Sequence, residues 1–289
     1  MAGEMNVQWF PGHMTRALRA MEADLKLVDG VCELTDARIP RSSRNPALDE
    51  LLGKKPRLLI LNRADQADGA LTRAWLDFYA RRGIPAIETD AKSGRGIDRF
   101  PAALRELLAD KLSALAAKGQ ATKPLRVMVV GIPNVGKSSF INRCAGRRAA
   151  PASDKPGVTR GRQWVTISRG LLLLDTPGVL WPRFEDPVIG QHLAFTGAVK
   201  DQVYDVEELA CALLPLLAGR APAALAERYK LTETEGQAGW ELLEAAAKNR
   251  GCLISRGEPD TLRMANILLD EFRAGKLGRL TLEAPDAEA

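Results

Sequence analysis

Residues 131–138 read Gly131-Ile-Pro-Asn-Val-Gly136-Lys137-Ser138, a pattern of the form GxxxxGK[ST]. The apolar run 126–130 before it predicts a buried strand, and the residues after it predict a helix that runs towards Arg143. A strand, a glycine-rich loop and a helix in this order bind phosphate, because backbone N–H groups and the helix N-terminus point at the anion. Lys137 is expected to reach the β and γ phosphates of a nucleotide and to act in catalysis, and the Ser138 hydroxyl to hold Mg²⁺. The predicted nucleotide contacts in this loop are Asn134, Val135, Gly136, Lys137, Ser138 and Ser139.

Two further segments fit a phosphate and metal site. Asp175-Thr-Pro-Gly178 follows the apolar run 171–174, where a carboxylate at the end of a strand can meet the magnesium shell. Gly178 is expected to offer its N–H to the γ phosphate. Between the two motifs lies the loop 155–161, whose Thr159 would close over Mg²⁺ when the γ phosphate is present. This loop is interpreted as a mobile switch with a catalytic and metal-binding role for Thr159.

Earlier in the chain, two loops follow strands and are typical of base recognition. Asn62-Arg63-Ala64-Asp65 follows the run 57–61, and the second loop follows the strand predicted at 85–89. The carboxylate of Asp65 can accept from N1–H and the exocyclic amine of guanine, whereas adenine would leave it unpaired. Taken alone, the NRAD and DTPG segments are ordinary turn sequences. The predicted base-site residues are Asn62, Arg63, Ala64, Asp65, Asp90, Ala91 and Lys92.

The predicted fold class is α/β, followed by a small all-α bundle. Apolar strands alternate with amphipathic helices over the first 200 residues, which indicates a parallel-rich sheet covered by helices on both faces. The expected strands are 30–35, 57–61, 85–89, 125–130, 164–168 and 171–174, and one long helix is expected over 97–117. Beyond residue 200 the strand signals stop. The predicted domains are therefore 1–200, a helical domain over 201–282, and a disordered tail over 283–289.

Composition limits the class of protein. Among the 289 residues, 46% are hydrophobic and 27% charged, which is typical of a globular chain. No apolar run approaches the 18 residues of a membrane helix, and the N-terminus lacks the pattern of a secretory signal, so a cytoplasmic protein without a membrane partner is expected. The four cysteines form no CxxC pair, which argues against a zinc knuckle or a disulfide framework.

Charge is distributed unevenly along the chain. Residues 122–200 carry twelve basic and four acidic side chains, a net +8, whereas residues 201–289 carry ten and sixteen, a net −6. A basic region of this kind can meet a polyanion such as RNA, and a solvated surface is the less favoured interpretation. The candidate RNA-binding residues are Arg147, Arg148, Arg160, Arg162, Lys248, Arg250, Arg273, Lys276 and Arg279.

Together, the NRAD, DAK, GIPNVGKSS, GVTRG and DTPG segments resemble the five guanine-nucleotide motifs of translation-factor-type GTPases, in circularly permuted order. That order, with WFPGHM at residues 9–14 and DARIP at 36–40, resembles the YlqF/RbgA family of ribosome biogenesis GTPases, as do 251–255 and 275–279 in the C-terminal part. The resemblance implies a circularly permuted P-loop GTPase domain and a helical domain that binds ribosomal RNA and protein. It further implies an enzyme that converts GTP to GDP, binds a late precursor of the large ribosomal subunit, is stimulated by that particle and leaves on hydrolysis. A monomer is expected.

The chain departs from familiar GTPase patterns at two positions. Arg63 stands where the base loop usually has Lys, and the two side chains are not equivalent, because a guanidinium is planar. Val179 follows DTPG, where many GTPases carry the Gln that orients the attacking water. The resemblance points instead to His13 of WFPGHM as the catalytic group. It also points to Asn134 as a ligand for K⁺ bridging the phosphates.

Other functions fit parts of the pattern. A scaffold that senses guanine nucleotide without significant hydrolysis is compatible with Val179. A small-subunit assembly GTPase shares the permuted order, but the zinc cluster expected of that family does not fit these cysteines. A P-loop metabolic kinase is least favoured, because two base loops indicate guanine and no second substrate pocket is legible.

Overall fold

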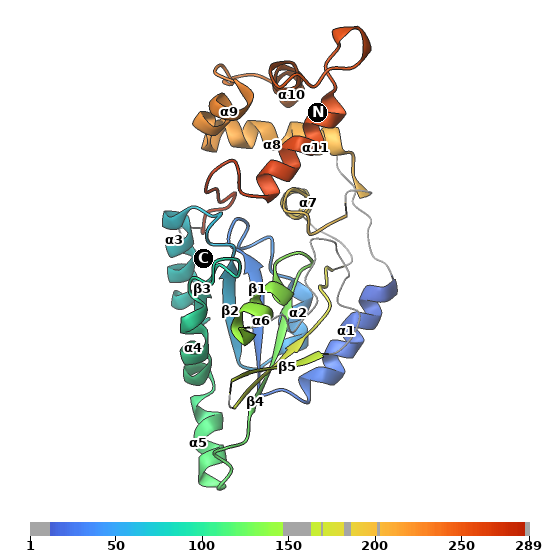
Figure 1. The fold of residues 1–289 in the computed structure, drawn as a ribbon. Coiled ribbons are helices and arrows are strands. Elements are labelled where there is room, and N and C mark those ends of the chain that lie inside the picture. Colours follow the sequence, from blue (N-terminus) through green and yellow to red (C-terminus); the bar gives the residue numbers. More distant parts are fainter. Residues whose placement is uncertain (1–11, 147–162, 169, 182–185, 201–202, 287–289) are drawn as a thin grey trace. The chain divides into compact units, whose positions relative to one another are not determined.

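The computed structural model describes residues 12–146, 163–168, 170–181, 186–200 and 203–286, with side chains from Arg16 onward. The chain folds into two compact units, which are described separately. Within the described residues, the α/β unit comprises 12–181 and 283–286, and the helical unit comprises 186–282. Figure 1 shows the strands of the first unit and the helices of the second.

The α/β unit is built on a six-stranded sheet with the order β3-β2-β1-β4-β6-β5. All neighbours are parallel except β5, which pairs antiparallel with β6 at one edge. The strands are β1 Gly30–Asp36, β2 Arg57–Asn62, β3 Ala86–Glu88, β4 Leu125–Gly131, β5 Gln163–Ser168 and β6 Leu171–Asp175. The central strand β1 is buried along its whole length, as a strand covered on both faces must be. The predicted α/β class and all six predicted strands are thus confirmed.

Helices complete the α/β unit: α1 Gly12–Leu25, α2 Pro46–Leu52, α3 Gly69–Arg81, η1 Ile97–Arg99, α4 Phe100–Leu107, α5 Ala109–Ala117 and α6 Lys137–Ala145. The single helix predicted over 97–117 was wrong in one respect, since it divides at Leu108, where φ is −107° and ψ is 21°. Leu108 is buried, and its side chain lies only 3.2 Å from the position that a Cβ on Gly30 would take. This contact with β1 depends on tertiary packing, which helical periodicity does not describe.

The order in which the chain adds strands to the sheet reverses between β1 and β4, although the two strands are parallel. The chain passes from β1 to β2 to β3 on one side, and from β4 to β6 on the other. Because these strands are parallel, Asp36, Asn62, Gly131 and Asp175 end them at one edge of the sheet. In open α/β sheets such a switch point leaves a crevice outside the carboxyl ends of the strands, where ligands bind.

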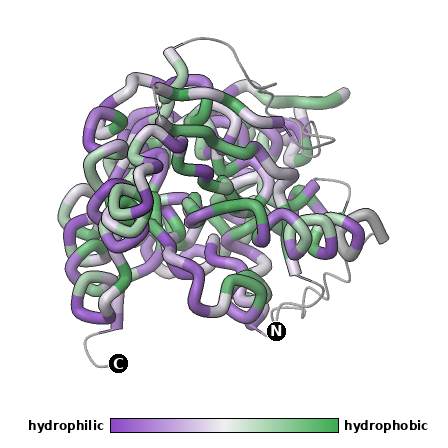
Figure 2. The backbone as a smooth tube through the Cα atoms, turned by 90° about the horizontal axis from the view of Figure 1, so that it is seen from below, coloured by the Kyte–Doolittle hydropathy of each residue, from purple (hydrophilic) through white to green (hydrophobic). Residues whose placement is uncertain are grey.

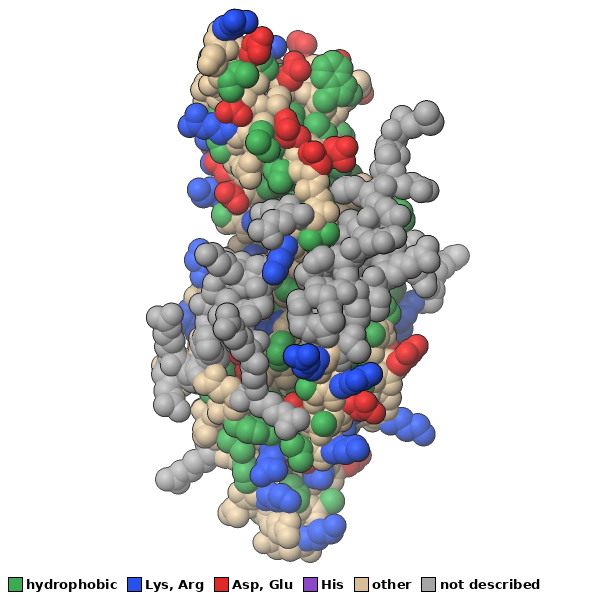
Figure 3. Space-filling model, turned by 90° about the vertical axis from the view of Figure 1, so that its right-hand side faces the viewer, with side chains coloured by type: hydrophobic (Ala, Val, Ile, Leu, Met, Phe, Trp, Pro, Cys, Tyr) green, Lys and Arg blue, Asp and Glu red, His purple; other side chains and the backbone are tan. Residues whose placement is uncertain are grey.

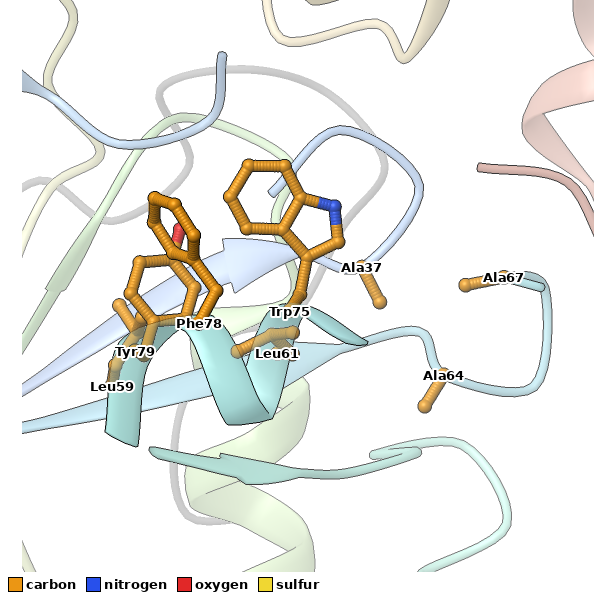
Figure 4. Packing of buried hydrophobic residues seen from close by; sticks show 8 residues of the cluster. All are labelled: Ala37, Leu59, Leu61, Ala64, Ala67, Trp75, Phe78 and Tyr79. Atoms are coloured by element: carbon orange, nitrogen blue, oxygen red, sulfur yellow. The ribbon is translucent and has the colours of Figure 1, made fainter. Parts of the chain in front are cut away.

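A cluster of buried side chains joins α3 to the sheet. The aromatic rings of Trp75, Phe78 and Tyr79 lie together on α3, and the ring centroids of Trp75 and Phe78 are 5.1 Å apart at 70°. Figure 4 shows the three rings gathered together, with the small residues Ala37 and Ala64 on neighbouring loops. Edge-to-face contacts of this kind add to the stability gained from burial. The cluster fixes the loops that leave β1 and β2.

The helical unit contains α7 Pro187–Phe195, α8 Val206–Arg220, α9 Pro222–Tyr229, α10 Gly239–Asn249, η3 Ser255–Gly257 and α11 Thr261–Arg273. Helix α10 crosses α8 closely at Gly239, where an added Cβ would lie 1.9 Å from the carbonyl oxygen of Cys211. Figure 2 shows hydrophilic residues in purple and hydrophobic residues in green alternating along the turns of the tube. Among the described residues no single helix could span a membrane by length and hydropathy, and only the pair α8 and α9, bent by 118°, passes such a test together.

Two predicted boundaries differ from the structure. Within the described residues the helical unit begins at residue 186 rather than 201, because α7 packs against α8 and α11. The tail was expected to be disordered from Glu283, but residues 283–286 are placed on the α/β unit. There the main-chain oxygen of Glu283 accepts from Trp75 Nε1 at 3.2 Å. The composition of the tail is typical of disorder, and the hydrogen-bond donors on the folded unit explain why these residues are ordered.

Candidate nucleotide-binding site

The phosphate loop joins β4 to α6 in a conformation that requires glycine. Gly131 has φ 149°, Gly136 has φ 97°, and Asn134 between them is also left-handed at 56°. A Cβ at Gly136 would lie 2.5 Å from Asn62 Nδ2, so the two loops approach too closely for any larger residue. The loop is therefore shaped by its glycines and held against the end of β2.

Lys137 begins α6 and is buried beneath the phosphate loop. Its Nζ donates to the carbonyl oxygens of Ile132 at 2.8 Å and Gly131 at 3.2 Å. Burial lowers the pKa of Lys137 to about 8, and the carboxylate of Asp175 partly offsets this effect. A buried cation beside a helix N-terminus and a ring of backbone amides is an arrangement that a polyanion stabilises.

Ser138 and Asp175 come together next to Lys137. The Ser138 hydroxyl donates to Asp175 Oδ2 at 3.1 Å, and Asp175 is fully buried at the end of β6. A hydroxyl and a carboxylate are the hard oxygen donors that Mg²⁺ prefers, and this ion commonly takes few protein ligands beside phosphate oxygens and water. Within the described residues, no group of three or more His, Cys, Asp or Glu side chains could hold a metal. The pair Ser138 and Asp175 thus fits a magnesium ion shared with a nucleotide.

The turn after β6 packs directly against the phosphate loop. A Cβ at Gly178 would lie 2.7 Å from the Pro133 backbone and 2.8 Å from Lys137 Nζ. The Val179 amide donates to the Gly131 carbonyl at 3.3 Å, and the Val179 side chain is completely buried. Gly178 therefore lies where its N–H can face a γ phosphate, whereas Val179 belongs to the core and offers no polar group to water.

Asn62 connects the phosphate loop to both base loops. Its Nδ2 donates to the Val135 carbonyl at 2.9 Å, and its Oδ1 accepts from Ala91 N and Thr89 Oγ1, each at 3.1 Å. The Ala64 amide also donates to the Thr89 carbonyl at 3.1 Å. Asn62 thereby brings into one site the phosphate loop, about 70 residues away in the sequence, and the second base loop, about 30 residues away.

Arg63 lies at the centre of these contacts. It adopts a left-handed φ of 61°, and its Nη2 donates to the Asn134 carbonyl at 2.8 Å. Its Nε lies 3.8 Å from Asp36 Oδ2, at the end of β1. Burial alone would raise the pKa of Asp36, but the Arg38 guanidinium, with a smaller contribution from Arg63, holds it below the usual value. Asp65 follows in the same turn and is half-buried.

Asp36 is not among the predicted site residues, although it begins the DARIP segment at 36–40. The sequence signals for it were this segment and its position at the end of an apolar strand. The loop after β3 is ordered by local contacts instead: Asp90 Oδ1 accepts from Lys92 N at 2.8 Å, and Arg143 Nη2 donates to the Lys92 carbonyl at 2.5 Å. Burial would raise the pKa of Asp90, but hydrogen bonds from Ser93 and Lys92 lower it.

Several predicted residues lie outside the described part of the chain. These are Thr159, Arg147, Arg148, Arg160 and Arg162, together with the side chain of His13, which lies in α1. Their roles stay predictions.

The basic candidates in the helical unit have different surroundings. Lys248 pairs with Glu244 at 3.8 Å, Arg250 lies 3.7 Å from Glu271, and Lys276 and Arg279 are exposed. Arg273 donates to the carbonyls of Ala194 and Phe195 at the end of α7 and to the Tyr204 hydroxyl, so it has a structural role within the unit. On the face in Figure 3, blue basic side chains alternate with red acidic ones over the helical unit, at the top.

A phosphate loop after β4, a carboxylate at the end of β6 and two base loops that precede both in the chain define a circularly permuted P-loop GTPase. Residues 126–235 match the family described as 50S ribosome-binding GTPase. The ribosome biogenesis GTPase A of Bacillus cereus is 44% identical to this chain, and the alignment covers 98% of this chain and 95% of the relative. The ribosome biogenesis GTPase A of Priestia megaterium is 45% identical, and the alignment covers 97% of this chain and 98% of the relative. The chain belongs to the ribosome biogenesis GTPase A family.

A mitochondrial and a structural relative agree with this assignment. The mitochondrial ribosome-associated GTPase 1 of Mus musculus is 35% identical over 98% of this chain and 92% of its own length. The crystal structure of GNP-bound YlqF from Thermotoga maritima superposes with a TM-score of 0.65 at 28% identity, covering 94% of this chain and 99% of that one. A GDP-bound YlqF structure superposes with a TM-score of 0.63. The expected family and permuted fold are therefore confirmed.

Proposed function

We propose that this GTPase acts at a late step in assembly of the large ribosomal subunit, binding the precursor particle with GTP and leaving after hydrolysis. The observation that carries the nucleotide part is the double contact of Asn62 with the phosphate loop and the base loop. The names of the family members support the ribosomal part. We expect the protein to act as a monomer in the cytoplasm.

Binding of the nucleotide follows from the geometry of the phosphate loop. Backbone amides of residues 134–139 and the N-terminus of α6 would surround the phosphates, and Lys137 would exchange its contacts to Gly131 and Ile132 for phosphate oxygens. Mg²⁺, held by Ser138 and Asp175, would neutralise charge on the β and γ phosphates. Asp65, in the turn after β2, would select guanine by pairing with N1–H and the exocyclic amine.

Hydrolysis needs a group that orients water. Val179 is buried and apolar, so it cannot do so. We propose His13 for this role, supported by the WFPGHM segment, with Thr159 completing the metal site when the γ phosphate is bound. K⁺ coordination by Asn134 is a separate prediction. With the water-orienting group outside the phosphate loop, intrinsic turnover is expected to be slow and to rise when the particle orders the loops.

Particle binding would use exposed basic side chains, which can approach an RNA backbone. Lys276 and Arg279 in the helical unit are exposed, and Arg147, Arg148, Arg160 and Arg162 in the 143–169 segment add charge of the same sign. Contacts to phosphates of this kind weaken as salt rises, because counterions are released on binding. Arg273 is excluded from this set, since its guanidinium is used inside the helical unit.

The decisive experiment measures GTP hydrolysis with and without purified large ribosomal subunits, beside co-sedimentation with the GTP analogue or GDP. We expect strong stimulation and retention only with the analogue. If large subunits bind the protein but leave its rate of GTP hydrolysis unchanged, a scaffold that only senses the nucleotide would be favoured. Single-turnover assays with excess protein would distinguish such a scaffold from an enzyme. Retention on small subunits alone would contradict the proposal.

A further inference from the structure

The turn after β1 binds the end of the chain through a converging set of donors. Glu283 Oε2 accepts from Arg41 N at 2.6 Å, and Oε1 accepts from Ser42 N at 3.0 Å. The Ser42 hydroxyl also donates to Oε1. We call Arg41 and Ser42 the carboxylate site and residues 283–286 the acidic tail. Two successive backbone N–H groups and a hydroxyl that point at one anion form a recognised type of binding site.

Two further contacts hold the acidic tail at this place. Trp75 Nε1 donates to the Glu283 main-chain oxygen at 3.2 Å, and the Arg41 guanidinium pairs with Asp286 Oδ2 at 2.5 Å. The same guanidinium lies 5.6 Å from the centroid of the Trp75 ring. The pair with Asp286 is exposed and contributes little, whereas Ser42 and Trp75 are 2% and 1% exposed. Glu283 therefore contributes more than Asp286 to the binding of the acidic tail at the carboxylate site.

The carboxylate site is built into the fold and does not depend on the tail for its shape. Ser43 Oγ accepts from the Asp36 amide at 2.9 Å and donates to the Ile39 carbonyl at 2.7 Å, which closes the turn at the end of β1. Buried backbone N–H groups are almost always hydrogen-bonded, so the amide of Ser42 needs an acceptor here. Glu283 supplies it from the chain's own terminus.

The other end of the same turn is bonded to the segment that follows Gly178. Asn45 Nδ2 donates to the Val179 carbonyl at 3.1 Å, and Asn45 Oδ1 accepts from Ala47 N at 3.0 Å. Both Asn45 and Val179 are buried. If the Gly178 turn shifts on loss of the γ phosphate, the Val179 carbonyl moves with it and displaces Asn45, which lies three residues from Ser42.

We propose that the carboxylate site is a docking site for the acidic tail, with Glu283 as its ligand, and that its occupancy is coupled to the nucleotide through Asn45 and Val179. The coupling rests on the proposed function of the nucleotide site, but the docking does not. The tail contacts one end of the turn after β1, and the γ phosphate acts on the other end through Val179 and Asn45. Binding of the γ phosphate therefore changes the affinity of the carboxylate site for the tail, and docking of the tail changes the affinity for the nucleotide by the same factor.

The test is hydrogen exchange of the full-length chain over residues 38–45, with E283Q as the variant. E288Q is the matched control, because it removes the same charge from the same terminus. In nucleotide-free protein we expect E283Q to raise exchange at residues 41–42 at least tenfold, and E288Q to leave it unchanged. Equal exchange in the two variants would overturn the docking site.

Coupling is tested by the same measurement with GDP and with a GTP analogue. In the wild type we expect exchange at residues 41–42 to differ at least threefold between the two nucleotides, and E283Q to remove that difference. Identical exchange under both nucleotides would overturn the coupling. Nucleotide affinity is measured on the same samples: absence of guanine-nucleotide binding would refute the proposed function, while the nucleotide-free comparison would still decide the docking site.

Discussion

The α/β unit and the helical unit both bury charged and polar side chains, but they use them differently. In the α/β unit, Asn62, Lys137 and Asp175 end different strands or begin a helix and face one loop. In the helical unit, Glu271 on α11 accepts from Arg228 at 2.9 Å and from the Tyr229 hydroxyl at 2.7 Å. The first set converges on a place for a ligand, whereas the second is satisfied within itself. Substitutions in the first should change binding, and those in the second should change stability.

The largest effect is expected at the phosphate loop. Lys137→Ala removes the buried cation, and a charge-assisted contact worth about 3 kcal/mol corresponds to roughly 100-fold weaker GTP binding. The fold should be retained, because the side chain bonds only loop carbonyls in the structure described. Titration with a fluorescent GTP analogue measures the change. Lys123→Ala, at an exposed position, is the control, and equal affinities for the two variants would refute the assignment.

Helix packing in the helical unit should be almost as sensitive. Gly239→Ala would place a methyl group 1.9 Å from the Cys211 carbonyl, so α8 and α10 must separate. Overpacking against backbone predicts a loss of about 3 kcal/mol in unfolding free energy, without change in nucleotide affinity. The matched control is Gly219→Ala in α8, where nothing lies within 4 Å of the new Cβ. Denaturant unfolding should show the control to be neutral or stabilising, and a stable Gly239→Ala would contradict the crossing.

The Glu271 cluster should show in the pH dependence of stability. The hydrogen bond from Arg228 is the main cause that lowers the pKa of Glu271 to about 2. A lowered folded-state pKa contributes stability above the unfolded value and loses it as pH falls. Glu271→Gln should therefore cost about 2 kcal/mol at neutral pH, and the difference from the wild type should shrink between about pH 5 and pH 2. A difference that does not vary with pH would refute the ionic contact.

Proton uptake should accompany nucleotide binding. The pKa of Lys137 is lowered to about 8 by burial, and the phosphates of a nucleotide would raise it. Affinity should be nearly constant well below this pH and fall about fivefold between pH 8 and pH 9, since the free protein loses the proton that the complex keeps. Calorimetry in buffers of different ionisation enthalpy measures the uptake. Lys137→Ala should lack this dependence.

The smallest effect is expected at the base loop. Arg63→Lys can keep the contact to the Asn134 carbonyl but lacks the planar fork that also approaches Asp36. GDP and GTP affinities should change by only about threefold, equivalent to roughly 0.7 kcal/mol. Arg105→Lys, exposed on α4, is the control. A loss as large as that of Lys137→Ala would show that Arg63 positions the whole phosphate loop.

Much of the α/β unit follows from local sequence. Runs of four to six residues bounded by turns identify the strands, and GxxxxGK[ST] and DTPG predict the phosphate and metal residues, because close backbone approach permits few residue types there. The division of the long helix at Leu108 could not be predicted, since it depends on packing beside Gly30. The ordered tail could not be predicted either, because the donors that bind it come from residues 41–42 and 75, far away in the sequence.

The sequence by itself determined the strands, the phosphate loop and the choice of guanine, since each depends on residue types within a short segment. It also determined the permuted motif order, which is the order of such segments along the chain. Only the tertiary structure decided that Asn62 joins three loops, that Arg63 lies between Asn134 and Asp36, and that Glu283 returns to the turn after β1. These contacts link segments far apart in the chain. Their geometry is set by the pairing of parallel strands, which no local pattern encodes.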